Sequence, residues 1–176
     1  MASPVGHALV GIGLAALSVP LLGATPGPAL WMGAIIASGV PDLDFVAVLL
    51  GYKLERVHRR ATHSLLVLSA FAALVLWISS YLGAPVDKPT VWAWVIALLA
   101  HPLVDALMTK VEEGRASMGI PLFWPLCSRR YHLPRPLVRT PTLDSYRSLA
   151  LLRELWPEIA LFGPTCLTLV LLGRVL

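Results

Sequence analysis

Residues 91–109 read VWAWVIALLAHPLVDALMT, and this stretch decides the fold class. It is apolar over a length that crosses the ~30 Å hydrocarbon core of a bilayer as one helix. Two ionisable side chains, His101 and Asp105, interrupt it. Ionisable groups at membrane depth are costly and mark functional sites by default, so the stretch predicts a membrane helix that carries part of a buried polar site.

The rest of the chain has the same apolar character. Hydrophobic residues make up 57% of the 176 residues and charged residues 14%, whereas a soluble domain carries about 25% charged residues. This composition excludes a disordered chain, a basic nucleic-acid-binding module and an ordinary soluble domain. Cys127 and Cys166 lie in different kinds of segment, which predicts neither a disulfide framework nor a zinc cluster. We expect a single membrane-embedded domain over residues 1–176.

Four further apolar stretches approach the ~20 residues that a membrane helix needs. They are residues 5–23, 29–50, 62–84 and 155–176. The first twenty residues contain no Lys or Arg, which favours a retained first helix over a signal peptide. Pro41 predicts a break in the second stretch, with a shorter helix through 43–50. The predicted fold is an all-α, polytopic membrane helix bundle with about four or five transmembrane helices.

The distribution of basic residues predicts the orientation. Twelve of the fourteen Lys and Arg residues lie in 51–61 or 110–154, whereas the loops on the other side hold only Lys88. By the positive-inside rule, the N-terminus and both basic segments face the cytoplasm. Within 110–154 we expect a Pro-rich stretch (119–141) and an amphipathic helix (142–153) at the cytoplasmic surface of the cell (inner) membrane.

Ionisable side chains from four stretches fall in one layer. They are His7, Asp42, Asp44, His63, His101 and Asp105, with His58 just outside the third stretch. At 1.5 Å per helical residue, each lies within roughly 12 Å of the cytoplasmic end. All are nitrogen or oxygen ligand types, so the layer predicts a metal site. Taken singly, each is also compatible with a hydrogen-bonded core residue or an interhelical polar clamp. His132, in the basic loop, is expected at the surface.

Several motifs occur in an order that resembles one family. They are His7, PDLD (41–44), HRRATHS (58–64), HPLVD (101–105) and GIPLFWPL (119–126). Over about residues 3–145 the chain resembles the YdjM-like inner-membrane family of metal-dependent hydrolases, a domain of unknown function. The His-rich helical site is also distantly similar to zinc-dependent phospholipase C and P1-type nucleases.

The resemblance implies a bound divalent metal and hydrolytic chemistry. The ligands that it implies are His7, Asp42, Asp44, His58, His63, His101 and Asp105. Family members often follow the Pro-rich stretch with a Gly-Ser turn and a Glu, where this chain has Asp144, whose role stays open.

We therefore expect a membrane-bound hydrolase that cleaves a phosphoester or ester of a lipid or lipid-linked substrate through metal-activated water. Seven ligands exceed the set that one zinc ion uses, which favours two ions, with zinc expected and manganese or magnesium as alternatives. Asp44 is the expected general base. Arg59, with Arg60, is a candidate phosphate-binding group, with positive-inside anchoring as the alternative.

Two other functions compete with hydrolysis. One is a non-catalytic carrier of metal ions or protons, since intramembrane His and Asp residues also build such pathways. The other is a structural membrane protein whose basic region contacts anionic lipid. No nucleic-acid partner is expected.

Overall fold

The structure is a computed structural model that describes residues 2–44, 50, 61–83, 86–108, 119–135, 137 and 150–175. Its elements are α1 (Pro4–Leu22), α2 (Pro28–Gly39), the 3₁₀ turns η1 (Val40–Asp44) and η2 (Ala61–His63), α5 (Leu65–Leu82), α6 (Lys88–Met108) and α7 (Ala150–Val175). The helices α1, α5 and α6, together with residues 151–175 of α7, are long and apolar enough to cross a membrane. The predicted all-α membrane bundle is confirmed.

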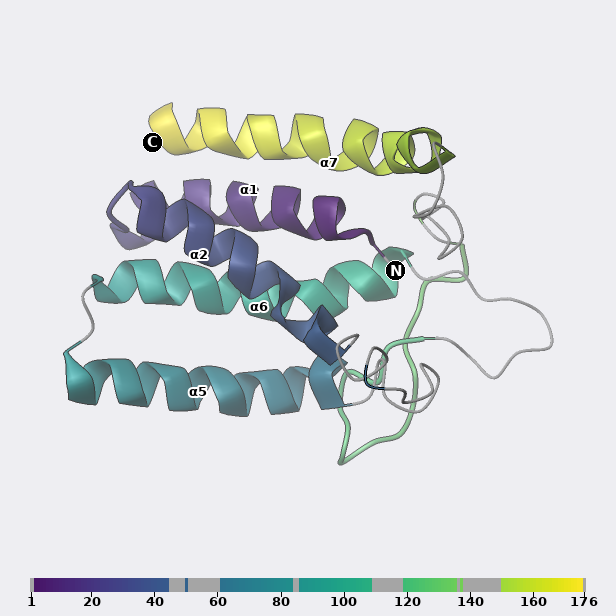
Figure 1. The fold of residues 1–176 in the computed structure, drawn as a ribbon, viewed down its shortest axis with the longest axis horizontal. Coiled ribbons are helices and arrows are strands. Elements are labelled where there is room, and N and C mark those ends of the chain that lie inside the picture. Colours follow the sequence, from purple (N-terminus) through teal and green to yellow (C-terminus); the bar gives the residue numbers. More distant parts are fainter. Residues whose placement is uncertain are drawn as a thin grey trace.

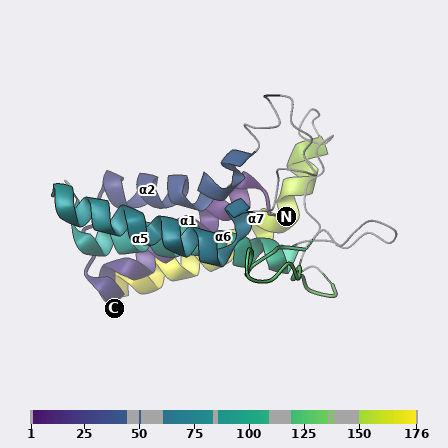
Figure 2. The same cartoon turned by 90° about the horizontal axis from the view of Figure 1, so that it is seen from below.

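The long helices lie side by side, with α7 at one edge, α5 at the other and α1, α2 and α6 between them (Figure 1). The view from below shows the same roughly parallel arrangement (Figure 2). Helix α1 is central, because it contacts α2, α6 and α7. The N-terminus, η1 and η2 lie at one end of the bundle and the C-terminus lies at the other (Figure 1).

The second apolar stretch forms a shorter helix than its length predicted. Helix α2 has 12 residues and ends at Gly39, where the chain continues as η1. Twelve helical residues cover about 18 Å, which is short of the hydrocarbon core. Pro41 lacks an N–H and cannot continue the α-helical ladder, so the predicted break is confirmed. The shorter helix expected through 43–50 falls mostly on residues that the structure does not describe.

Glycines allow the helices of the bundle to approach closely. A Cβ added to Gly11 of α1 would lie 2.9 Å from the carbonyl oxygen of Ala34 in α2. A Cβ added to Gly33 of α2 would collide with the indole ring of Trp94 in α6. Small residues at such contacts are how membrane helices pack without a hydrophobic driving force between them.

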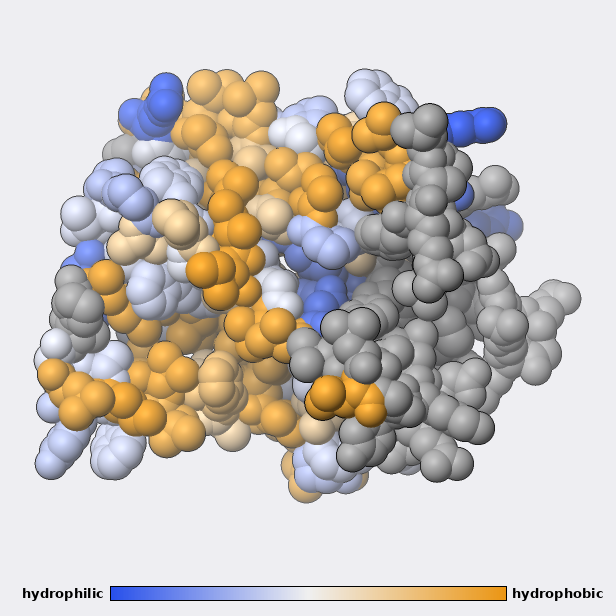
Figure 3. All heavy atoms as spheres, viewed as in Figure 1, coloured by the Kyte–Doolittle hydropathy of each residue, from blue (hydrophilic) through white to orange (hydrophobic). Residues whose placement is uncertain are grey.

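Large apolar side chains cover the outside of the bundle. Trp77 of α5 is 65% exposed and Leu167 of α7 is 59% exposed. Hydrophobic atoms also spread over much of the face in Figure 3, where hydrophilic atoms are visible in a hollow near the middle. An apolar exterior of this extent suits helices surrounded by hydrocarbon.

At the end of the bundle opposite the N-terminus, Asp87 stabilises the start of α6. Its Oδ1 accepts a hydrogen bond from the backbone N–H of Thr90 at 2.8 Å, and its Oδ2 accepts one from the Thr90 hydroxyl at 2.9 Å. The Thr90 backbone N–H holds the pKa of Asp87 below its usual value, because hydrogen bonds to a carboxylate favour the ionised form.

We predict that Gly11→Ala destabilises the protein by about 1–3 kcal/mol, because the new Cβ meets backbone that cannot move aside cheaply. The measurement is thermal unfolding in detergent. Gly163→Ala in α7 is the matched control, since its Cβ would meet only Ile159, at 3.8 Å. Equal unfolding temperatures for the two variants would contradict the close α1–α2 contact.

Candidate metal centre

Four side chains converge at the N-terminal end of the bundle: Asp42 of η1, His63 of η2, and His101 and Asp105 of α6. Each offers one ligand atom, and these atoms lie within 4.8 Å of one another. His63 Nε2 lies 3.2 Å from His101 Nε2, 3.3 Å from Asp105 Oδ2 and 3.5 Å from Asp42 Oδ1. His101 Nε2 lies 3.5 Å from Asp42 Oδ1 and 3.8 Å from Asp105 Oδ2. These four residues could hold a metal ion.

The end of α2 fixes the orientation of His101. Pro41 has no N–H to donate to the carbonyl three residues before it, which belongs to Ser38. That carbonyl oxygen lies 2.6 Å from His101 Nδ1. Because a carbonyl oxygen only accepts, Nδ1 carries a proton and donates it, which leaves Nε2 as the nitrogen that faces the centre and that can offer a lone pair there.

A short relay fixes the orientation of His63 in the same way. The Thr62 hydroxyl donates to Asp44 Oδ2 at 2.7 Å, so its oxygen is free to accept from His63 Nδ1 at 3.1 Å. The neutral form of the His63 ring therefore presents the lone pair of Nε2 to the centre, whereas a protonated ring would donate from Nε2 to Asp105 and Asp42. Asp44 Oδ2 lies 3.7 Å from His63 Nδ1, on the edge of the ring that faces away from the centre.

Asp105 is held by hydrogen bonds to the carboxylate oxygen that faces away from the centre. Its Oδ1 accepts hydrogen bonds from the backbone N–H of Ala2 at 2.9 Å and from His7 Nε2 at 3.2 Å, while its Oδ2 faces the centre. The His7 ring also stacks on His101, with 3.6 Å between the ring centroids. Such outer partners orient metal ligands and are usual around metal sites.

The chemistry of the converging atoms fits a cation. With both rings neutral, two imidazole lone pairs face each other at 3.2 Å, beside two carboxylate oxygens. Asp42 Oδ1 is buried and has no hydrogen-bond partner among the described residues. Lone pairs and negative charge at these distances repel one another in an apolar interior, and a bound divalent ion would turn that repulsion into attraction.

The predicted site residues divide into three groups. Asp42, His63, His101 and Asp105 form the cluster, and the structure places His7 and Asp44 against its members from outside. His58, Arg59 and Asp144 lie outside the described residues. His132 is exposed.

Glu158 of α7 was missed by the sequence reasoning, although it lies inside the last apolar stretch. It is fully buried and accepts hydrogen bonds from the backbone N–H and the hydroxyl of Ser3. Ser3 is the N-cap of α1, where its hydroxyl accepts from the N–H of Gly6. The signal that could have found Glu158 is a carboxylate within an apolar run.

The GIPLFWPL motif supports the start of α5 and contributes no residue to the cluster. The backbone N–H of Leu65 donates to the carbonyl of Leu122 at 2.9 Å, and the Ser64 hydroxyl donates to the carbonyl of Trp124. Ser64 is the N-cap of α5 and directly follows His63. The motif therefore holds the backbone on which His63 sits.

We predict that Thr62→Val weakens divalent-metal binding by about 10–100-fold, because losing the relay releases the His63 ring. The measurement is a competition titration with a chromogenic zinc chelator. Thr165→Val is the matched control, since the Thr165 hydroxyl donates to the Leu161 carbonyl within α7, away from the centre. Equal affinity for both variants would show that the relay does not orient His63.

Comparison with known proteins places the chain in a family. No curated protein and no solved structure matches it. The family model of the YdjM inner membrane protein matches residues 1–175, which is nearly the whole chain. This confirms the resemblance seen in the motifs, and the chain belongs to the YdjM inner membrane protein family.

Proposed function

We propose that the chain is a membrane-bound hydrolase that uses one divalent metal ion, preferably zinc, to cleave a phosphoester or ester bond of a lipid or lipid-linked substrate. The cluster of converging lone pairs carries the proposal. Ligand atoms at 2.0–2.1 Å from a tetrahedral zinc ion lie about 3.3–3.4 Å from one another, whether three or four of them come from the protein. The separations given above, 3.2–3.8 Å, are close to that spacing.

Asp42 differs from the other three residues in a way that favours catalysis over a closed structural site. The side chains of His63, His101 and Asp105 are fully buried and held by outer partners, whereas Asp42 is 15% exposed. Catalytic zinc sites use three protein ligands and keep one position open. We therefore assign metal binding to His63, His101 and Asp105, and the general base to Asp42.

This assignment changes three sequence-based roles. Asp44 acts as a positioning residue for His63 through Thr62 and leaves the general base to Asp42. His7 positions Asp105 and does not bind the metal itself. The described residues provide one group of converging ligands, so we propose one ion at this group. Arg59 remains the proposed phosphate-binding group.

A divalent ion at this site would lower the pKa of a bound water and polarise the oxygen of the scissile group. Asp42 accepts the proton of the attacking water on Oδ1, which lies 3.5 Å from both imidazoles. The partners of His63, His101 and Asp105 keep these side chains in place, so that little reorganisation accompanies the reaction. Burial of His63, His101 and Asp105 keeps bulk water away from these three ligands.

The described residues support a one-sided site over a carrier. A carrier needs polar side chains on the path to the far end of the bundle. Beyond His101, the same face of α6 continues through Ala97 and Trp94, which carry no ionisable group, to Thr90, whose hydroxyl already donates to Asp87 at the start of the helix.

We further propose that the metal centre lies near the cytoplasmic surface. Arg129, Arg130 and Arg135 belong to the segment at the metal-centre end of the bundle, whereas Lys88 lies at the opposite end (Figure 1). The positive-inside rule gives the richer end to the cytoplasm.

We predict that purified protein holds one equivalent of zinc and hydrolyses a phospholipid panel that contains phosphomonoester, phosphodiester and carboxylic-ester bonds. Asp42→Asn should keep the metal and lower kcat by about 10²–10⁴-fold, because it removes the general base. His63→Ala should lose both metal and activity. The measurements are elemental analysis and product release.

Asp87→Asn is the matched control, because it makes the same change at the far end of the bundle and Asn replaces Asp well at helix starts. It should retain metal and activity. Zinc-loaded protein that cleaves no member of the panel would refute hydrolysis. Loss of metal from Asp42→Asn would indicate a closed, non-catalytic site of four ligands.

The orientation is tested by cysteine labelling in intact cells, with Cys127 and Cys166 replaced by Ser. Lys88→Cys should react with a membrane-impermeant maleimide, whereas Arg135→Cys should react only after permeabilisation, because both side chains are exposed but lie at opposite ends. The reverse pattern would place the metal centre on the outer side.

A further inference from the structure

We propose that an apolar groove between α2, α5 and α6 binds one hydrocarbon chain of the lipid whose ester or phosphoester group is cleaved at the metal centre. The inference rests on the proposed function and names the part of the substrate that the groove recognises. The groove is separate from the cluster, since none of its lining residues belongs to it.

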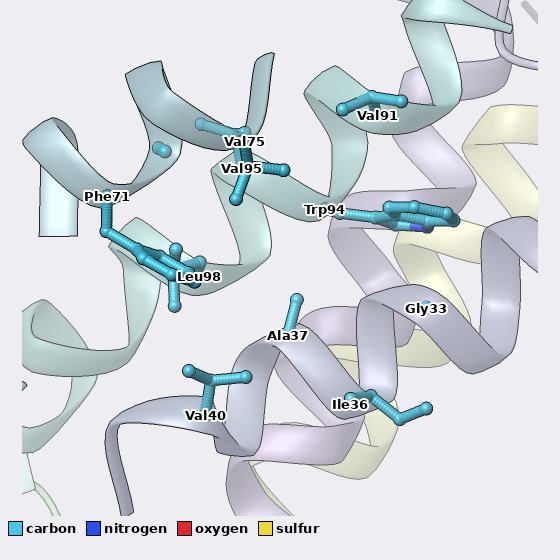
Figure 4. Close-up of a pocket in the computed structure, with 11 residues that line it drawn as sticks. Gly33, Ile36, Ala37, Val40, Phe71, Val75, Val91, Trp94, Val95 and Leu98 are labelled. Carbon is cyan, nitrogen blue, oxygen red and sulfur yellow. The ribbon is translucent and has the colours of Figure 1, made fainter. Parts of the chain in front are cut away.

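The groove has a volume of about 320 Å³ and is lined almost entirely by apolar atoms. Figure 4 shows Phe71 and Val75 of α5 with Val95 and Leu98 of α6 on one side, facing Ala37 and Val40 of α2. This volume lies within the range of small-ligand sites.

Small residues of α2 and α5 leave the space that forms the groove. Gly33 and Ala37 of α2 and Ala72 of α5 present little side chain to it. Helix α5 contacts α6, and α6 contacts α2, so that α6 forms the floor between them. Because α5 and α6 are candidate membrane spans, the surroundings of the groove are lipid hydrocarbon.

One end of the groove lies about one turn of α6 away from the metal centre. Leu98 lines the groove and precedes His101 by three residues, which puts both on the same helix face. On α2, Ala37 lines the groove and is followed by Ser38, whose carbonyl bonds His101. From Asp105 to Val91, fourteen residues of α6 span about 21 Å. A chain lying in the groove would therefore point its polar end at the cluster.

The lining selects hydrocarbon over a polar ligand. Trp94 lines the groove, and its indole N–H already donates to the carbonyl of Ala29 at 3.2 Å. The other lining side chains named here have no hydrogen-bonding group. An acyl or isoprenoid chain needs no polar partner, whereas a sugar or peptide placed here would lose its hydrogen bonds to water.

Groove-filling variants test the proposal. Ala72→Phe fills the groove, whereas Ala73→Phe adds the same ring on the exposed face of α5. Val75→Phe and its control Leu74→Phe form a second pair in case Ala72→Phe does not fold. Folding is checked by size-exclusion chromatography and zinc content, which should be unchanged in both controls and in at least one groove variant.

The first readout is kcat/KM for a long-chain substrate and for a soluble short-chain substrate with the same scissile bond. In the groove variants, kcat/KM for the long-chain substrate should fall by at least about tenfold, which corresponds to about 1.4 kcal/mol of binding free energy. Their kcat/KM for the short-chain substrate should not change. The control variants should keep their kcat/KM for both substrates. An equal loss for both substrates, or no loss for the long chain, would overturn the proposal.

The second readout does not require hydrolysis. A phosphatidic acid with a diazirine on its acyl chain is crosslinked to protein in detergent micelles and mapped by mass spectrometry. Crosslinks to groove residues that persist in Ala73→Phe and vanish in Ala72→Phe support the proposal, even if no substrate is cleaved. Crosslinks spread evenly over the lipid-facing helices would indicate annular lipid only and overturn it, even if hydrolysis is found.

Discussion

The described structure depends on one electrostatic constraint. Atoms that present lone pairs or negative charge lie 3.2–3.8 Å apart inside an apolar bundle. Such an arrangement is unfavourable unless a metal ion or a proton lies between these atoms, and it persists only where surrounding groups hold each member in place. Many local features of the fold at this end of the bundle provide that hold, including the Ser38 carbonyl, the Thr62 hydroxyl and the backbone N–H of Ala2.

The same constraint gives a reason for the short second helix. An α-helix that continued past Gly39 would engage the Ser38 carbonyl in its own ladder and carry Asp42 around the helix axis. The 3₁₀ turn at Pro41 instead leaves the carbonyl for His101 and brings Asp42 to the cluster. The loss of a full membrane span and the assembly of the centre therefore have one local cause.

Sequence patterns predicted the helices and the layer of ionisable side chains. They predicted only in part which of these side chains form the cluster and which lie behind it. The spacing of His101 and Asp105 put both on one helix face, and Pro41 predicted the break in the second stretch. His7 and Asp44 are of the same residue types as the cluster residues, so residue type alone does not distinguish them. They differ in that each contacts a cluster residue at an atom that faces away from the centre. Glu158 was missed because its partner, Ser3, lies 155 residues away in the chain.

The buried contacts of Ala2 and Ser3 have a consequence for biogenesis. Ala2 donates to Asp105 of α6, and Ser3 donates to Glu158 of α7, so each is held by a residue that is made 103 or 155 positions later in the chain. The centre cannot reach its final form until α6 and α7 have left the ribosome and entered the membrane. A nascent chain therefore passes through insertion before the cluster is complete, and a metal ion would find all of its ligands only in the completed bundle.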